Sequence, residues 1–344
     1  MDARYLRAIS TLILLALVLL LISPPGHAQQ AQAVSVERAG FTTIMNGDAP
    51  QDGWHAYRWD AFPRVYILHF DTYLLQGQML NRMAAYNEKV GLRGMVLSWR
   101  ELETILRQRG YSMENVYGAH DYPTSDLARF FSALSSAGEP LNDAEGQLLD
   151  FLTAAGLLKW DGQRWVHTGA DSVLSFATRY LGRELPSSRV LGQPARRFEA
   201  HGLYHEMRHG LYFTISSYAD ACYRYWYNVL SDDQRRAFRL ILMLYDYNPQ
   251  DEDLMINEWH AYLLTPSYEF IGVMAFTSKL RNIASGRENP RALTQQERDF
   301  LRGIGKQLAD DIEQWMIDDF RQYLGSKYDV PTAATVQAFS YSDK

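Results

Sequence analysis

The stretch HGLYHEMRHGLYF, residues 201–213, places two histidines four residues apart around a glutamate: His205, Glu206 and His209. On an α-helix, residues i and i+4 lie on one face, so both imidazoles would reach a single metal ion. Glu206 stands beside the first histidine, where its carboxylate can contact a water molecule without binding the metal. The pattern predicts a site in which zinc lowers the pKa of that water and Glu206 accepts its proton.

A catalytic zinc site needs a third protein ligand and leaves the fourth position to water. The segment DLMINEWHAYLL supplies Glu258, 49 residues after His209. Leu254, Ala261 and Tyr262 lie three or four residues from Glu258, which places this glutamate on the apolar, inward face of a predicted helix. A carboxylate on that face is costly unless it is paired or binds a metal. Glu258 is therefore the predicted third ligand.

HEMRH followed by NEWHA resembles the gluzincin branch of the zincin metallopeptidases, which carries H-E-x-x-H on one helix and a glutamate on a later one. The resemblance covers roughly residues 199–264. It implies a helical zincin-like core in which His205, His209 and Glu258 bind zinc and Glu206 is the general base. It also implies an edge strand that pairs with a peptide substrate, for which SVLSFAT (172–178) and SSRVLG (187–192) are the candidates.

Other residues near the motif have less distinctive patterns. Zincins use a histidine or a tyrosine to stabilise the oxyanion, and Tyr262, one turn after Glu258, is our candidate; core packing is the alternative. His201, one turn before His205, either contacts substrate or ligands or is simply packed. Cys222 is the one cysteine, so it cannot form an internal disulfide, and we expect a buried structural thiol.

The hydrophobic spacing predicts a mainly α protein of the α+β class, with a small β-hairpin or minor sheet. Asp161-Gly162 between two apolar runs predicts a hairpin near 157–167. RVYILHF (64–70) and SVLSFATRYLG (172–182) fit a strand or a buried helix, and residues 29–60 look irregular. Apolar residues recur at helical spacing in eight segments: 71–89, 98–110, 123–138, 142–156, 195–213, 232–247, 251–264 and 294–325.

We predict three regions along the chain. Residues 1–28 have the pattern of a signal peptide: Arg4 and Arg7 precede an apolar run, which ends before helix breakers and Ala28. Cleavage after Ala33 and an uncleaved membrane anchor are the alternatives. Residues 29–170 form a mostly helical region that contains the hairpin, and residues 171–344 form the helical metal-binding region. No later stretch is long and apolar enough to cross a bilayer.

Composition narrows the classes of function. Among 344 residues, 47% are hydrophobic, which suffices for a large core. The net charge of -6 argues against a nucleic-acid surface, which needs a basic face to neutralise phosphates. The predicted location is the periplasm or the extracellular space, because the signal pattern directs export.

The residues predict a zinc-dependent metallohydrolase, and the resemblance favours a peptidase that acts on peptides or proteins, cell-wall peptides among them. Two alternatives remain. In the first, zinc serves structure or binding because a side chain such as His201 closes its fourth position. In the second, the chain is a helical, envelope-associated binding protein in which HEMRH is incidental, and Glu258 then lies far from the histidines.

Overall fold

The apolar run VYILHF belongs to strand β3 (Val65–Thr72), all of whose residues are buried. Such an unbroken run is typical of a strand that is covered on both faces. β3 occupies the middle of a five-stranded mixed sheet in the order β1-β2-β3-β7-β4. It pairs parallel with β7 and antiparallel with β2, whereas β4 forms one edge and runs antiparallel to β7.

The computed structural model describes residues 35–47, 49–114, 116–179, 195–265, 272–325 and 328. The remaining strands are β1 (Val36–Ala39), β2 (Trp54–Trp59), β4 (His120–Pro123), β5 (Leu158–Trp160), β6 (Trp165–His167) and β7 (Ser172–Arg179). The helices of the first half are α2 (Phe41–Asn46), α3 (Tyr73–Asn87), α4 (Trp99–Gln108), α5 (Thr124–Ala137) and α6 (Asp143–Ala154). Those of the second half are α8 (Ala195–Thr214), α9 (Ser216–Asn228), α10 (Asp232–Met243), α11 (Glu252–Leu264), α12 (Val273–Ala284), α13 (Gln295–Asp311), the π-helical η1 (Ile312–Met316) and α14 (Ile317–Leu324).

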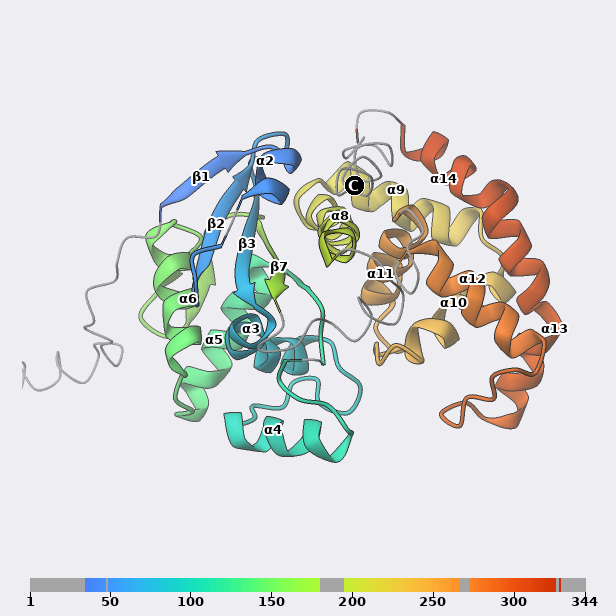
Figure 1. Cartoon of the computed structure of the whole chain (residues 1–344), viewed down its shortest axis with the longest axis horizontal. Coiled ribbons are helices and arrows are strands. Elements are labelled where there is room, and N and C mark those ends of the chain that lie inside the picture. The colour runs from blue at the N-terminus through green and yellow to red at the C-terminus, as the bar shows by residue number, and fades with distance from the viewer. Residues whose placement is uncertain are drawn as a thin grey trace, which may run out of the picture.

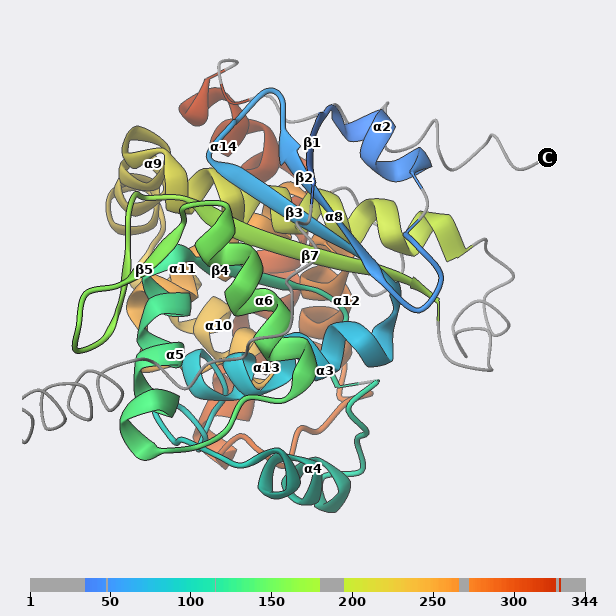
Figure 2. The same ribbon diagram turned by 90° about the vertical axis from the view of Figure 1, so that its left-hand side faces the viewer.

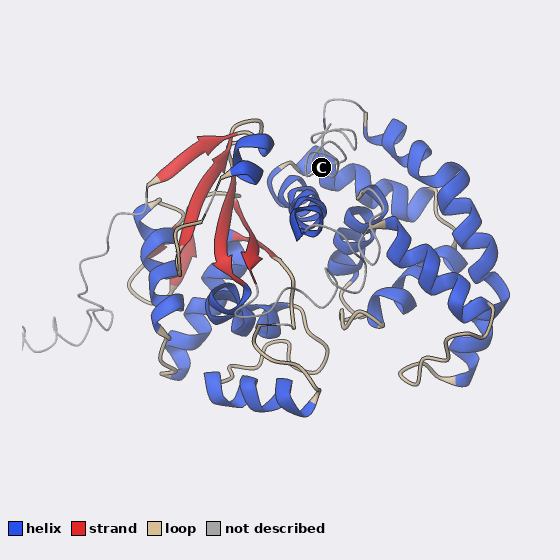
Figure 3. Cartoon of the chain, viewed as in Figure 1, coloured by secondary structure: helices blue, strands red, loops and turns tan. Residues whose placement is uncertain are grey.

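Helices cover both faces of the sheet (Figures 1 and 3). On one face, α3, α5 and α6 pack against alternate residues of β3 and β7, such as Leu68 and Val173. Figure 2 shows α5 and α6 in front of that face. On the other face, Ile67 and Leu174 join the large core that α8 to α14 build. Alternation along each strand thus divides the apolar side chains between two cores.

Helix α8 is the layer between the sheet and the other C-terminal helices. From Leu203 to Tyr212 all of its residues are buried, which is typical of a helix surrounded by protein. Gly210 lets it approach the sheet closely, because a Cβ there would lie 3.0 Å from Val65 Cγ1 and 3.2 Å from Leu174 Cδ1. A larger residue would push α8, and the HEMRH segment with it, away from β3 and β7.

Most of the local predictions are confirmed. All eight predicted helical segments form helices, and the last one contains the π-helical η1. Ser98 with Glu101, and Asn142 with Glu145, make capping boxes at the starts of α4 and α6. The hairpin β5–β6 turns at Asp161-Gly162, and the two ambiguous apolar runs form β3 and, over its described residues 172–179, β7. The mixed α+β class with mostly helical content is as predicted.

Two expectations need correction, and others lie outside the described residues. Residues 36–59 are not irregular: they contain β1, α2 and β2. The two strands form because β2 pairs with β3 and β1 pairs with β2, and local sequence does not reveal these backbone partners. SVLSFAT lies in β7, an interior strand, so it cannot be the predicted edge strand. The signal pattern and SSRVLG lie outside the described residues. None of the described helices has the length and apolarity needed to span a membrane.

Candidate metal centre

The three predicted ligands meet where α8 and α11 pack together. His205 and His209 lie one turn apart on α8, and Glu258 reaches them from α11. Their side chains are buried, with exposed fractions of 10%, 1% and 3%. The two imidazole Nε2 atoms are 3.1 Å apart, and each lies 3.8 Å from Glu258 Oε2. The helix spacing of HEMRH and the inward face of α11 therefore converge on one point.

Hydrogen bonding assigns the tautomer of His205. Thr265 Oγ1 donates to the carbonyl of Ala261 at 2.6 Å, so it can only accept from His205 Nδ1, which is 3.3 Å away. Nδ1 of His205 therefore carries a proton, and Nε2 faces His209 Nε2 at 3.1 Å and Glu258 Oε2 at 3.8 Å. A partner that holds the second ring nitrogen in this way is the usual arrangement for a metal-ligating histidine.

This group fits a zinc ion in its donor types and spacing. Two imidazole nitrogens and one carboxylate oxygen are a donor set used by catalytic zinc sites. Ligand atoms about 2.0–2.1 Å from a tetrahedral ion are about 3.3 Å apart, between the 3.1 and 3.8 Å observed here. Glu258 Oε2 is buried and accepts no hydrogen bond from any described residue, which would be costly without a cation. His205, His209 and Glu258 can therefore hold a metal ion.

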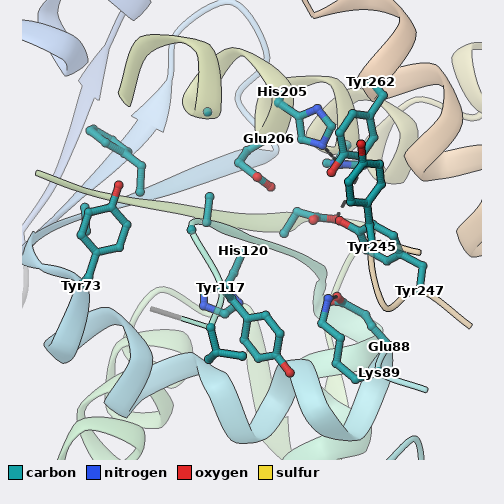
Figure 4. A pocket seen from close by; sticks show the side chains of 18 residues that line it. Tyr73, Glu88, Lys89, Tyr117, His120, His205, Glu206, Tyr245, Tyr247 and Tyr262 are labelled. Carbon is teal, nitrogen blue, oxygen red and sulfur yellow. Dashed lines mark hydrogen bonds and ion pairs between the residues drawn. The ribbon is translucent and has the colours of Figure 1, made fainter. Parts of the chain in front are cut away.

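Glu206 lies beside these ligands and lines a cavity of about 280 Å³ (Figure 4). His205 and His209 line the same cavity, so the centre is reached from it. Burial raises the pKa of Glu206 to about 7, an effect that His205 opposes and Glu258 reinforces. A carboxyl group with such a pKa can accept and release a proton near neutral pH.

The edge strand β4 forms the wall of the cavity opposite α8 and contributes two residues. Asp121 Oδ1 lies 3.8 Å from His209 Nδ1, and Asp121, Glu206 and His209 form a second group whose ligand atoms lie within 4.8 Å of one another. Burial and the charges of Glu206 and Glu258 raise the pKa of Asp121 well above its usual value. Two carboxyl groups this close share a proton, since both cannot ionise cheaply. The neighbouring His120 forms a hydrogen bond through Nδ1 with Tyr122 Oη, at 3.0 Å.

We expect Asp121 to orient His209 for metal binding. Its carboxyl group lies 3.8 Å from Nδ1, the ring nitrogen that faces away from Glu258. A cation at the centre would favour the ionised form of this carboxyl group, and such an outer partner raises the basicity of the ligand. The variant Asp121→Ala should bind zinc about 10–100-fold more weakly, measured by competition with a chelator of known affinity. Asp171→Ala, which loses only an ion pair with the half-exposed Arg64, is the control. Equal affinity in both variants would contradict this role.

Tyr262, the predicted donor to an oxyanion, lines the cavity next to His205, with 4.7 Å between the ring centroids. Burial raises its pKa, so the hydroxyl keeps its proton and remains a donor. Tyr245 and Tyr247 line the same wall, and Tyr245 stacks on Tyr262 at 5.7 Å. The position agrees with the predicted role, but two further tyrosines share it, and the role stays a prediction.

One end of the cavity carries an ion pair between Lys89 and Glu88, which we did not predict from the sequence. Lys89 Nζ lies 3.0 Å from Glu88 Oε2, in the segment that follows α3. Burial disfavours the charge of Lys89, but the Glu88 carboxylate outweighs this and raises its pKa, so the ammonium stays charged. The signal for Asp121, Glu88 and Lys89 is absent from the local sequence, because each reaches the centre only through long-range packing.

His201 and Cys222 are both buried. Among the described residues, His201 belongs to neither group that could hold a metal ion. Burial raises the pKa of the Cys222 thiol well above its usual value, as expected for a structural thiol.

Comparison of the chain with models of protein families, with curated proteins and with solved structures found no match. The resemblance to gluzincins is therefore carried by HEMRH and NEWHA and by their geometry, and not by similarity along the chain. A buried His-His-Glu group that could hold a metal ion is the feature on which a functional conclusion can be built.

Proposed function

We propose that this chain is a zinc-dependent hydrolase of peptide bonds. The observation that carries the proposal is that His205, His209 and Glu258 meet, and that His205, His209 and Glu206 line one cavity. Two of the sequence alternatives lose support from the same geometry. An incidental HEMRH requires Glu258 to lie far from the histidines, and closure of the site by His201 requires that residue to join the group, which it does not among the described residues.

A zinc ion held by the three ligands would polarise a substrate carbonyl and lower the pKa of a water molecule toward neutrality. Glu206 accepts a proton from that water as its oxygen forms a bond to the carbonyl carbon. The same carboxyl then passes the proton to the nitrogen as the carbon–nitrogen bond breaks, so no charge is left on the leaving amine. The hydroxyl of Tyr262 donates to the oxygen on which negative charge develops.

The edge strand supports an extended peptide as substrate. β4 (His120–Pro123) pairs with β7 on one side only within the described sheet, and it lies along the cavity. An extended peptide can add to such an edge through backbone hydrogen bonds, which hold it without regard to its side chains. We also propose, from the N-terminal signal pattern, that the protein acts in the periplasm or outside the cell, where cell-wall peptides are among the available substrates.

The test is hydrolysis of a library of fluorescence-quenched peptides by the purified protein. We expect cleavage that stops when a chelator removes the metal and returns when one equivalent of zinc is added. Elemental analysis of the same sample should give one zinc ion per chain. Zinc without cleavage of any peptide or cell-wall fragment would mean a non-catalytic zinc protein. Absence of both zinc and cleavage would leave a binding protein.

A further inference from the structure

The charged end of the cavity holds Lys89 in a rigid setting. Its ammonium lies over the rings of Tyr117 and Tyr247, each with its centroid 4.6 Å from Nζ, and beside Glu88. Figure 4 shows the Lys89 and Glu88 head groups side by side and directed into the cavity, across from His205 and Glu206. Lys89 is the one lysine or arginine among the described residues that line this cavity.

A purely structural role does not account for Lys89. Other contacts already join the segment after α3 to the segment around the start of α11. Arg93 pairs with Asp251 at 2.6 Å and Arg109 with Asp246 at 3.3 Å, so the region after α3 is tied to the region around the start of α11. None of these four residues lines the cavity. Burial of an ammonium group costs far more free energy than these half-exposed ion pairs do. We therefore expect the charge of Lys89 to serve a function beyond joining the segments.

Within the part of the chain that the structure describes, the Lys89 ammonium forms one ion pair, with Glu88. It has three N–H donors, of which Glu88 takes one, while the two ring faces attract the charge without replacing an oxygen acceptor. Both side chains are largely buried, with exposed fractions of 7% for Lys89 and 16% for Glu88, so bulk water supplies few partners to either charged group. An anionic group that enters from the cavity would accept hydrogen bonds from the remaining N–H donors of the Lys89 ammonium.

We propose that Lys89 binds a carboxylate of the substrate, and that the preferred substrates are therefore peptides with a free carboxylate on one side of the scissile bond. The inference rests on the proposed function and adds its specificity. A carboxylate accepts charge-assisted hydrogen bonds from a pre-oriented ammonium, and these are among the strongest that a protein makes. The carboxylate comes either from the C-terminus of the peptide or from an aspartate or glutamate side chain.

Paired peptides test the proposal and separate the two sources. One pair differs only in a C-terminal acid or amide, and others differ in glutamate or glutamine at a single position. For the zinc-loaded wild type, we expect kcat/KM to be at least about tenfold higher for the acid in one kind of pair. In Lys89→Met the acid should lose about tenfold while the amide changes less than about twofold. Lys89→Arg should keep most of the preference.

Two further variants guard against an indirect effect. Glu88→Gln with Lys89→Met removes both charges, so no carboxylate is left buried alone, and it should lose the preference as Lys89→Met does. Arg93→Gln removes the ion pair with Asp251 outside the cavity and should keep the preference for the acid. Equal rates for acid and amide in the wild type, or an undiminished preference in Lys89→Met, would overturn the proposal.

Calorimetric binding separates this inference from the proposed function. The acid and the amide of the same peptide are titrated into the wild-type protein before zinc is added and into the zinc-loaded Glu206→Gln variant. Tighter binding of the acid that disappears in Lys89→Met supports the carboxylate site even if no peptide is cleaved. Cleavage without any difference in binding or rate between acid and amide leaves the hydrolase in place and removes the role of Lys89.

Discussion

Replacing His205 or Glu258 with alanine is expected to abolish stoichiometric zinc binding. Each variant leaves two of the three ligands of the His205, His209 and Glu258 group, so we expect the affinity to fall by more than the about 10–100-fold that is usual for outer partners. Zinc content after dialysis against a weak chelator measures the loss. The same variants should lose the thermal stabilisation by zinc, which amounts to about 4 kcal/mol at a thousandfold excess over Kd.

Matched variants on the same helices control this experiment. His201→Ala removes a buried histidine one turn before His205, and Glu252→Ala removes an acid of α11 that contacts Trp226 and Arg239. Both should keep one zinc per chain. If Glu258→Ala keeps it too, Glu258 is not a ligand and Asp121 is the next carboxylate to test. If His201→Ala loses it, the site is closed by a fourth side chain and the catalytic proposal fails.

The variant Glu206→Gln should retain zinc and lose activity. Glutamine has nearly the same shape but cannot accept a proton from water, and a general base contributes about 10²–10⁴-fold to rate. The comparison is kcat on one peptide, with zinc content measured on the same sample. Glu313→Gln, which affects a surface pair with Arg281, should behave as wild type. Activity within tenfold of wild type in Glu206→Gln would exclude Glu206 as the base.

The pH dependence of the same reaction has a definite sign. Glu206 must be ionised to accept a proton, so the rate falls when the pH drops through its pKa. Burial raises that pKa to about 7 in the protein without metal, and a cation beside the carboxylate favours the ionised form. With zinc bound, the acid limb of the profile should therefore lie below pH 7, and Glu206→Gln should lack it.

Local sequence determined the eight predicted helical segments, two of the capping boxes and the hairpin, whereas α2 and α12 were not predicted. Helical spacing, N-cap residues such as Ser98 and Asn142, and the Asp161-Gly162 turn act over a few residues, so their effect is visible without the rest of the chain. The strands of residues 36–59 were missed, because a short strand such as VERA has no strong preference of its own. It is a strand because β2 pairs with it.

For the metal ligands too, local sequence predicted one part of the arrangement and tertiary packing decided the other. The i, i+4 spacing of His205 and His209 is a property of one helix, and the inward position of Glu258 follows from the periodicity of another. That the two helices meet at these residues, with Nε2 and Oε2 atoms 3.8 Å apart, was decided by packing. Sequence periodicity orients a side chain relative to its own helix axis, but it carries no information on which neighbour that face will meet.

What surrounds the ligands was decided by tertiary structure alone. Asp121 and the edge strand β4 reach the centre because β4 pairs with β7, some fifty residues later in the chain, and β7 supports α8. Lys89 reaches it because the segment after α3 forms a bridge with Tyr247, more than 150 residues away. The sequence alone therefore determined the chemistry of the candidate centre, whereas its cavity, its edge strand and its charged end arise from contacts between distant segments, whose energies depend on the packed core.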